Sequence, residues 1–413
     1  MAKKRTLDAF FSPLSQSSVT QERQLLESQA RPTNNNKKQR TGLQSDGRER
    51  LPPPSTGPPS THRTYPFPIP RLPAPILSIL SPSANASPEH DTTAASSPLT
   101  PSPTLSTNPI TTATCPASIG LPVNDKPNLD LVYFEPFLPR PSANALFSFL
   151  RAALPFYRVR YRIQRGGVDT QINTPRYTTV FGVDETAAFD ALSGAVIDRP
   201  TGRPVPRERY RRAPRPLPQC LEALRVAVER ETGERFNFCL VNYYASGEDS
   251  ISYHSDDERF LGVEPAIASL SLGARRDFCM KSKPPPAMVA GTLAGAGAAV
   301  GAAGEASKPL KLPLGSGDLV LMRGKTQANW LHSIPKRKGG ESGRGRINIT
   351  FRRAMVRGGT ENYYQYNVGD GPVFRWDEEK GEMRAWEQVK QVGGGGESMV
   401  SQEDGSDLAG KRS

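Results

Sequence analysis

The sequence predicts a mainly β domain with a few helices, preceded by a long polar region. Residues 236–244 (FNFCLVNYY) are densely apolar and aromatic, which is typical of a strand that is buried on both faces. Residues 346–352 (RINITFR) alternate polar and apolar side chains, which is the two-residue period of a strand. Residues 218–236 instead show the three- and four-residue spacing of an amphipathic helix. The expected class is therefore β with some α.

The composition favours a basic intracellular protein with a polyanionic partner. The 413 residues carry a formal net charge of +12, and only 36% of them are hydrophobic. A net positive charge of this size indicates nucleic acid as the expected polyanionic partner. The alternative is that the charge only keeps the protein soluble. The chain has no run of about 18 apolar residues and no signal peptide, so we expect neither a membrane span nor secretion. Four cysteines without CxxC spacing are expected to be reduced thiols rather than zinc ligands: Cys115, Cys220, Cys239 and Cys279.

Composition also divides the chain. Residues 1–128 are rich in Pro, Ser, Thr, Asn and Gln and poor in aromatic residues, so we predict that this region is disordered. Residues 284–309 are nearly uncharged and of low complexity, which indicates a flexible insertion, and residues 393–413 resemble a disordered tail. The folded domain is expected over residues 129–357, with residues 358–392 packed on it as an extension.

The folded region is predicted to open with a strand and a helix. In the next strand, alternation puts Arg158, Arg160 and Arg162 on one basic face. Residues 174–182 (TPRYTTVFG) follow as a predicted loop, and the amphipathic helix then leads into the central strand. On that strand, Asn242 and Tyr244 share a face with apolar side chains. Buried polar groups need partners, and a bound ligand is one way to supply them.

A candidate metal site follows the central strand. His254 and Asp256 lie two residues apart, which alone is weak support because chance produces many such pairs. A site of the 2-His-1-carboxylate type needs one more histidine from another strand. Two of the four histidines, His62 and His90, lie in Pro/Ser/Thr-rich sequence that is not expected to form a core. His332 is the remaining candidate, and its alternative is an ordinary core or surface histidine.

A candidate anion site follows on the strand at residues 346–352. Alternation puts Arg346, Asn348, Thr350 and Arg352 on one face. Two arginines, an amide and a hydroxyl are unlikely to be buried together without an anion, and the planar guanidinium suits a carboxylate in bidentate geometry. The alternative is a basic surface strand that faces water or nucleic acid.

Together these residues resemble the AlkB family of Fe(II)- and 2-oxoglutarate-dependent dioxygenases, and most of all the member that repairs alkylated double-stranded DNA. The resemblance covers roughly residues 129–357 and includes, in the family's order, FNFCLVNYY, HSDDE, IASLSLGARRDF, LPLGSGDLVLM, WLHSIP and RINITFR. It implies a double-stranded β-helix, or jelly-roll, with a nucleotide-recognition cap of helices and loops formed by residues 129–235.

The resemblance also implies roles for individual residues. The iron ligands, which are also the catalytic residues, would be His254, Asp256 and His332. The 2-oxoglutarate contacts would be Asn242, Tyr244, Arg346, Thr350 and Arg352. The acidic pair that reads the flipped base would be Asp257 and Glu258. The lid over the nucleotide would contain Arg176, Tyr177, Phe181 and Tyr210, with ordinary packing as the alternative for each aromatic residue.

The implied reaction is oxidative demethylation of N1-methyladenine and N3-methylcytosine in DNA, with Fe(II), 2-oxoglutarate and O2, and with release of succinate, CO2 and formaldehyde. Both lesions have a blocked Watson–Crick edge, which eases flipping of the base out of the stack. Three alternatives stay open: the same chemistry on RNA or protein, a non-catalytic nucleic-acid or clamp adaptor, and a different jelly-roll metal enzyme. Strand preference, lesion range and the base-flipping residue are not predictable from the sequence.

The extreme N-terminus carries one further motif. Leu7, Phe10 and Phe11 have the spacing of a single helical turn and resemble the motif with which repair and replication proteins dock on the sliding clamp, PCNA. Lys4 stands where that motif usually has Gln, and an incidental hydrophobic segment is the alternative. Basic clusters at residues 3–5 and 37–40 are compatible with nuclear import or with solvated charge. We expect a nuclear protein that acts as a monomer.

Overall fold

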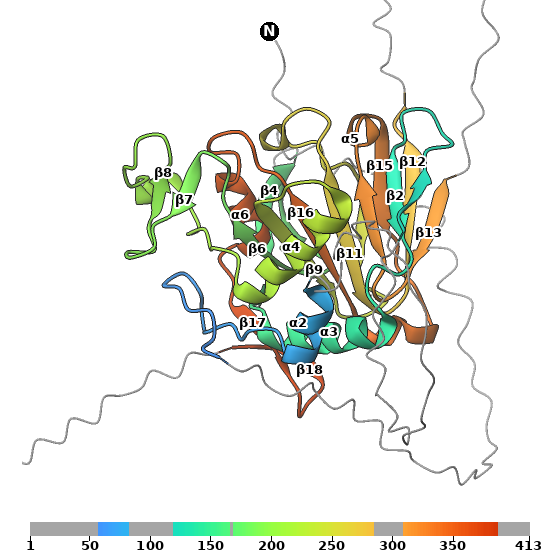
Figure 1. Cartoon of the computed structure of the whole chain (residues 1–413), viewed down its shortest axis with the longest axis horizontal. Helices are drawn as coiled ribbons and strands as arrows, with labels where there is room; N and C mark the ends of the chain where they lie inside the picture. Colours follow the sequence, from blue (N-terminus) through green and yellow to red (C-terminus); the bar gives the residue numbers. More distant parts are fainter. Residues whose placement is uncertain (1–56, 82–118, 166–167, 285–308, 387–413) are drawn as a thin grey trace, which may run out of the picture.

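Two antiparallel sheets face each other in the computed structural model, which describes residues 57–81, 119–165, 168–284 and 309–386 (Figure 1). The arrangement is that of a jelly-roll, and the prediction of a mainly β fold is confirmed. Within the described residues, no helix has both the length and the apolar character needed to cross a bilayer.

The larger sheet has ten strands and contains the predicted central strand. Its strands, in spatial order, are β1 (Leu121–Val123), β2 (Leu131–Phe134), β14 (Leu319–Met322), β11 (Ile267–Gly273), β16 (Arg346–Arg352), β9 (Phe238–Tyr244), β6 (Tyr177–Gly182), β3 (Phe156–Tyr157), β17 (Val373–Asp377) and β18 (Glu382–Ala385). The two strands singled out in the sequence, β9 and β16, pair directly in its centre.

The smaller sheet has four strands, and two separate hairpins complete the β structure. The four strands, in order, are β10 (Ile251–His254), β15 (Trp330–Ile334), β12 (Arg276–Ser282) and β13 (Leu310–Leu314). The hairpins are β4 (Arg160–Arg165) with β5 (Val168–Asn173), and β7 (Ala187–Phe189) with β8 (Val196–Asp198).

Helices cover the outer face of the larger sheet. These are α2 (Ala74–Leu80), α3 (Arg140–Ala153) and α4 (Gln219–Thr232), and their buried side chains form one core with that face. The remaining helices are α5 (Thr326–Asn329) and α6 (Glu361–Val368), with 3-10 turns at Arg207–Arg209, Arg259–Leu261 and Gly340–Arg344. A second core fills the space between the two sheets.

Strand alternation decides which side chains reach the space between the sheets. On β9, Cys239, Val241 and Tyr243 belong to the helix-covered core, whereas Leu240 and Tyr244 belong to the core between the sheets. The β9–β16 register sets Asn242 opposite Asn348 and Tyr244 opposite Arg346. The predicted polar face of β16 therefore points into the jelly-roll rather than toward water.

The first structured segment, residues 57–81, differs from the prediction that residues 1–128 are disordered. Ile69 is fully buried and Ile76 on α2 is 4% exposed, and both join the core formed with α4. His62, expected in sequence that forms no core, is half-buried and hydrogen-bonds with the Gly194 carbonyl oxygen at 3.0 Å. The proline content hid a short apolar run, PILSIL, that packs because α4 offers it an apolar face.

Residues 174–182 also differ from their prediction. They were expected to form a loop, but Tyr177–Gly182 is strand β6, which pairs along its whole length with β9. Tyr, Thr, Val and Phe favour strands, and this preference outweighs the proline that precedes the segment. From the predicted extension, α6 contributes Tyr363, Tyr364 and Val368 to the core between the sheets, and β17 pairs with β3.

Other predictions concern residues outside the described ranges. These are the clamp motif at Leu7, Phe10 and Phe11, the basic clusters, His90, Cys115, nearly all of the insertion and the C-terminal tail.

Candidate active site

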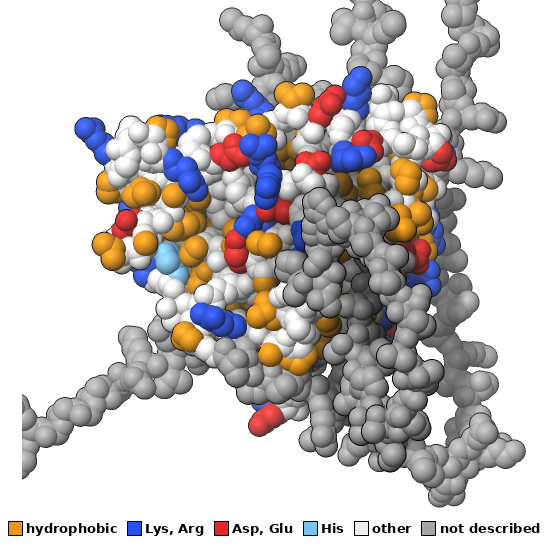
Figure 2. Space-filling view, in the orientation of Figure 1, with side chains coloured by type: hydrophobic (Ala, Val, Ile, Leu, Met, Phe, Trp, Pro, Cys, Tyr) orange, Lys and Arg blue, Asp and Glu red, His pale blue; other side chains and the backbone are white. Residues whose placement is uncertain are grey.

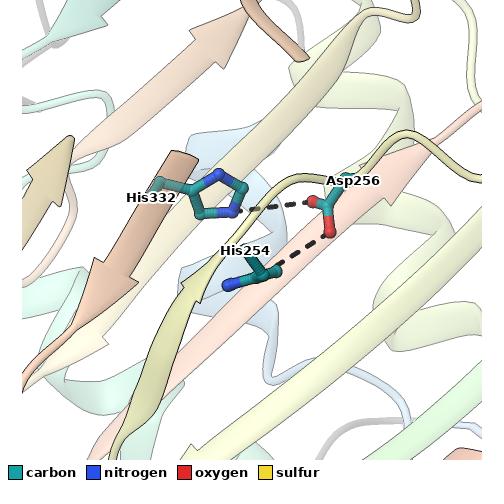
Figure 3. Close-up of side chains that lie close together, drawn as sticks. All are labelled: His254, Asp256 and His332. Atoms are coloured by element: carbon teal, nitrogen blue, oxygen red, sulfur yellow. Dashed lines mark ion pairs between the residues drawn. The ribbon is translucent and has the colours of Figure 1, made fainter. Parts of the chain in front are cut away.

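Three potential metal ligands converge at one end of the space between the sheets (Figure 3). His254 ends β10 and stands directly opposite His332 on the neighbouring β15. The Nε2 atoms of both imidazoles lie 3.8 Å from a carboxylate oxygen of Asp256. One ligand atom from each residue falls within 4.8 Å of the others, so a single ion can contact all three. Two imidazoles and one carboxylate on one side of an ion leave coordination positions open, as a facial triad does.

The protonation states of these residues also suit a cation. Burial lowers the pKa of His254 and, with the neighbouring imidazole, lowers the pKa of His332 to about 3, so both rings are neutral near pH 7. Burial alone would raise the pKa of Asp256, but the surrounding groups, Arg352 first among them, together outweigh burial and keep this pKa below its ordinary value. The site therefore presents two lone pairs and one negative charge.

Neighbouring groups fix the orientation of these ligands. The Nδ1–H of His254 donates to the Ser252 carbonyl oxygen at 2.9 Å, which leaves Nε2 as the lone-pair nitrogen. The backbone N–H of Asp256 donates to Oε1 of Gln327 on α5 at 2.9 Å. Gln327 in turn donates to Sδ of Met322. These contacts hold His254 and the backbone of Asp256 before any ion binds, whereas Nδ1 of His332 is buried without a protein partner.

A candidate anion site lies further along the same face of β16. Arg346 is 1% exposed, and its Nη2 donates to the Ser271 hydroxyl at 2.8 Å. Its guanidinium also lies over the ring of Tyr244, with Cζ 5.4 Å from the centroid. The Nε and Nη1 atoms are buried and have no protein partner. The Nε–H and the Nη1 hydrogens lie on different edges of the guanidinium, and each edge is completed by Nη2, so a carboxylate would meet one of these two edges.

Arg352, at the other end of β16, has a different environment. Its Nη2 lies 3.0 Å from Oδ2 of Asp256, and its Nη1 lies 3.7 Å from Oε1 of Glu258. Its Nη2 engages the metal-binding carboxylate and its Nη1 donates to Tyr363, while its Nε, like two nitrogens of Arg346, is buried without a protein partner. Alternation along β16 predicted that Arg346 and Arg352 share one face. In the structure they do, but Arg352 lies beside Asp256 and Arg346 lies beside Ser271 and Tyr244.

Comparison with known proteins agrees with this geometry. The family model described as the 2OG-Fe(II) oxygenase superfamily matches residues 130–352. The chain belongs to this superfamily. Membership implies Fe(II), 2-oxoglutarate and O2, as predicted, and both sites fit: the triad offers nitrogen and oxygen ligands to iron, and Arg346 offers unpaired donors to a carboxylate.

Curated relatives narrow the comparison to AlkB homologues. The chain is 33% identical over 235 residues to the protein named DNA oxidative demethylase ALKBH2 in Arabidopsis thaliana. The aligned region covers 55% of this chain and 67% of the relative. It is 41% identical over 134 residues to human alpha-ketoglutarate-dependent dioxygenase alkB homolog 3, which covers 32% of this chain and 41% of the relative. Human DNA oxidative demethylase ALKBH2 is 38% identical over 149 residues, 35% of this chain and 49% of its own length. The predicted AlkB resemblance is confirmed.

Asn242 and Thr350, two further predicted 2-oxoglutarate contacts, lie on the faces of β9 and β16 that point between the sheets. Oδ1 of Asn242 accepts a hydrogen bond of 2.7 Å from Nε of Arg176. The Thr350 hydroxyl donates to the Leu240 carbonyl oxygen at 3.1 Å. Arg176, predicted in the lid, is thus next to the site. Contact of these residues with 2-oxoglutarate or substrate stays a prediction.

The predicted acidic pair does not act as a pair. Asp257 is an exposed residue with an ion pair to Lys283 at 3.0 Å, so it points away from the interior. Glu258 points inward toward Arg352, and its Oε2 is buried without a protein partner. Burial raises its pKa to about 7. Of the two carboxylates, only Glu258 is placed to meet a ligand inside the oxygenase.

Two predicted lid aromatics are core residues. Tyr177 and Phe181 lie on the β6 face that carries the helix-covered core, and Phe181 is fully buried. Tyr177 packs against Tyr243 and Phe374. Because a strand sends alternate side chains to opposite faces, neither ring reaches the space between the sheets. The prediction that these two residues contact substrate is wrong.

Tyr210, also predicted in the lid, is half-buried away from the triad. Its charged neighbours are Asp184, Glu361 and Arg209, and burial above all raises the pKa of its hydroxyl. A contact between Tyr210 and substrate stays a prediction that this position does not favour.

A separate cleft of about 640 Å³ opens between α4, the β7–β8 hairpin and the ends of β6 and β9. Several of its charged side chains form ion pairs with one another, as in the Arg353–Glu185 and Arg225–Glu222 pairs. None of the candidate metal or anion residues lines it. We therefore place the chemistry between the sheets.

Two residues near the triad were not predicted. Gln327 holds the backbone of Asp256, and Tyr363 on α6 hydrogen-bonds with Arg352. Neither position stands out by spacing, because each is brought to the site by the tertiary fold. The density of aromatic residues in the C-terminal extension was the one signal for Tyr363.

Proposed function

We propose that this oxygenase is an oxidative demethylase of N-alkylated bases in DNA, acting on N1-methyladenine and N3-methylcytosine. The observation that carries the proposal is the placement of a facial triad and a partly unpaired buried Arg346 in one interior, with the Glu258 carboxyl beside the triad. The names of the relatives support DNA as the substrate, and so does the net charge of +12.

In this proposal each side chain has a defined task. His254, Asp256 and His332 would hold iron, and Arg346 would bind the far carboxylate of 2-oxoglutarate through one of its unpartnered nitrogens, Nε or Nη1. Iron and 2-oxoglutarate, when bound, supply O2-dependent hydroxylation of the N-alkyl carbon, with succinate and CO2 as co-products. The apolar walls between the sheets exclude water from the reaction. The hydroxylated alkyl group then leaves as formaldehyde and restores the base.

The substrate base must leave its stack to reach this interior. Flipping costs a few kcal/mol and is easiest for a base whose pairing is already damaged. Both proposed lesions carry a positive charge, which the inward carboxyl of Glu258 would favour once it is ionised.

On the face shown in Figure 2, Lys and Arg side chains lie among Asp and Glu rather than in one unbroken patch.

The test compares four substrates under the same conditions: duplex DNA, single-stranded DNA and RNA of one sequence with a central N1-methyladenine, and a methylated peptide. Methyl loss is measured by mass spectrometry after incubation with Fe(II), 2-oxoglutarate and O2. The proposal expects the DNA substrates to be turned over fastest. Faster turnover of RNA or of the peptide would move the same chemistry to that substrate and contradict the proposal.

We further propose that the protein works in the nucleus as a monomer and docks on the sliding clamp, PCNA, through Leu7, Phe10 and Phe11. The apolar spacing at the N-terminus and the basic cluster at residues 3–5 support this. A pull-down with purified clamp tests it: binding should be lost when Phe10 and Phe11 are both replaced by Ala. If the double variant still binds the clamp, the docking proposal is wrong and the demethylase proposal is unaffected.

A further inference from the structure

Tyr363 reaches the metal-binding residues from outside the family match, which ends at residue 352. It lies on α6 and is 7% exposed. Its hydroxyl accepts a hydrogen bond of 2.5 Å from Nη1 of Arg352. Its ring packs edge-on against Phe238 and Phe260, with both centroid distances 5.5 Å. The ring is therefore held by packing, and the hydroxyl is directed at the guanidinium.

Arg352 transmits this contact to the carboxylate. The guanidinium is planar and rigid, so fixing Nη1 also fixes the direction of Nη2. Nη2 lies 3.0 Å from Oδ2 of Asp256. With Oδ2 engaged in this way, Oδ1 is left for a cation.

A competing carboxylate makes the tyrosine contact important. Oε1 of Glu258 lies 3.7 Å from the same Nη1 that donates to Tyr363. Without the hydroxyl, this N–H would have the Glu258 carboxylate as an acceptor within reach. A turn of the guanidinium toward Glu258 would draw Nη2 away from Asp256.

We infer that Tyr363 is a positioning residue that aligns Arg352, and through it Asp256, for metal binding. The inference rests on the metal site proposed above but not on DNA as the substrate. It adds α6, a part of the C-terminal extension, to the determinants of the iron site.

Helix α6 is docked by other contacts, which separates the role of the hydroxyl from the role of the helix. The Tyr364 hydroxyl donates to the Gly182 carbonyl oxygen at 2.8 Å, and the Thr178 hydroxyl donates to the Asn367 carbonyl oxygen at 2.6 Å. Tyr363→Phe thus removes one hydroxyl and keeps the ring and the helix. Tyr364→Phe is the matched control, because it removes a neighbouring buried hydroxyl that bonds only with backbone groups.

The test titrates metal-free full-length protein with Mn(II) and follows the free ion by electron paramagnetic resonance. Outer partners of metal ligands typically change metal affinity by 10–100-fold, and Tyr363 acts one step further out, so we expect Tyr363→Phe to bind Mn(II) about 3- to 10-fold more weakly than wild type. Tyr364→Phe should bind Mn(II) like wild type and unfold at a lower temperature. Equal affinity in wild type and Tyr363→Phe would overturn the inference alone, whereas wild type that binds no Mn(II) would overturn the metal site as well.

A double variant excludes a purely structural explanation. If Tyr363 acts through Arg352, Tyr363→Phe should weaken Mn(II) binding much less in an Arg352→Lys background than in wild type. The ligand-field absorption of the Co(II)-loaded protein should likewise shift in Tyr363→Phe and not in Tyr364→Phe. Additive effects, or an unchanged spectrum, would contradict the assignment.

Discussion

Asp256 and Arg352 form a buried ion pair in which Nη2 of the arginine lies 3.0 Å from Oδ2 of the carboxylate, with side-chain exposures of 2% for Arg352 and 5% for Asp256. The same carboxylate lies between two neutral imidazoles. Arg352 therefore helps to keep Asp256 ionised when no metal is bound. The negative charge of this buried carboxylate is compensated by the guanidinium and does not depend on a metal ion.

Asp256→Ala should abolish turnover and leave DNA binding nearly intact. It removes one of three proposed iron ligands and also deprives Arg352 of its nearest anion. Removing one partner of a buried pair typically costs about 3–5 kcal/mol, so the variant should also be less stable to urea. Asp277→Ala, which breaks the more exposed pair between Asp277 on β12 and Lys311 on β13, is the control and should stay active. If Asp256→Ala supplied with iron turned over substrate at the wild-type rate, the assignment of Asp256 as a metal ligand would be wrong.

Arg346→Gln should raise the KM for 2-oxoglutarate and change kcat little. Hydrogen bonds to charged groups contribute about 1.5–3 kcal/mol, so we expect an increase in KM of about 10- to 100-fold. Steady-state succinate assays over a wide range of 2-oxoglutarate check this. Arg353→Gln is the control because this arginine is 49% exposed and pairs with Glu185. An unchanged KM in Arg346→Gln would remove Arg346 from the co-substrate site.

Glu258 should make folding of the metal-free protein depend on pH. Burial raises its pKa from 4.5 to about 7, so its contribution to stability is present in full below pH 4.5 and is lost as pH rises through 7. The slope is at most about 1.4 kcal/mol per pH unit. Glu258→Gln stays neutral, so its stability relative to wild type should increase between pH 5 and pH 8 in urea denaturation. Glu248→Gln, at a side chain that is 63% exposed, should show no such trend, and parallel curves for Glu258→Gln would contradict the raised pKa.

Phe181→Ala distinguishes a core residue from a substrate lid. Because Phe181 is fully buried in the helix-covered core, truncation should destabilise the protein by about 3–5 kcal/mol. The KM for methylated DNA, measured well below the unfolding temperature, should not change. A raised KM with unchanged stability would restore the lid interpretation.

The triad and the anion site could be predicted because a few strong constraints act on them. The chain has four histidines, and strand alternation alone aligns Arg346 and Arg352 on one face. Alternation also indicated that Asn242 and Tyr244 share a face, which the register with β16 bears out.

Predictions were weaker wherever tertiary packing decides. Strand β10 ends at His254, so no period could show that Asp257 faces water while Glu258 faces the interior. The sequence predicts a loop over residues 174–182 and so places Phe181 in the lid, whereas the structure has strand β6 there. Tyr363 reaches Arg352 only after α6 docks on β6 and β3; the aromatic residues of the extension indicate that it packs on the core, but not which side chain reaches Arg352.

The most direct test of the account is succinate formation by purified protein with Fe(II), 2-oxoglutarate and O2, with and without duplex DNA that carries N1-methyladenine. We predict that succinate rises with the lesion-bearing duplex and that one formaldehyde and one unmodified adenine appear for each additional succinate. Iron-loaded protein that forms no succinate with this duplex, or forms the same amount with unmodified duplex, would contradict the account.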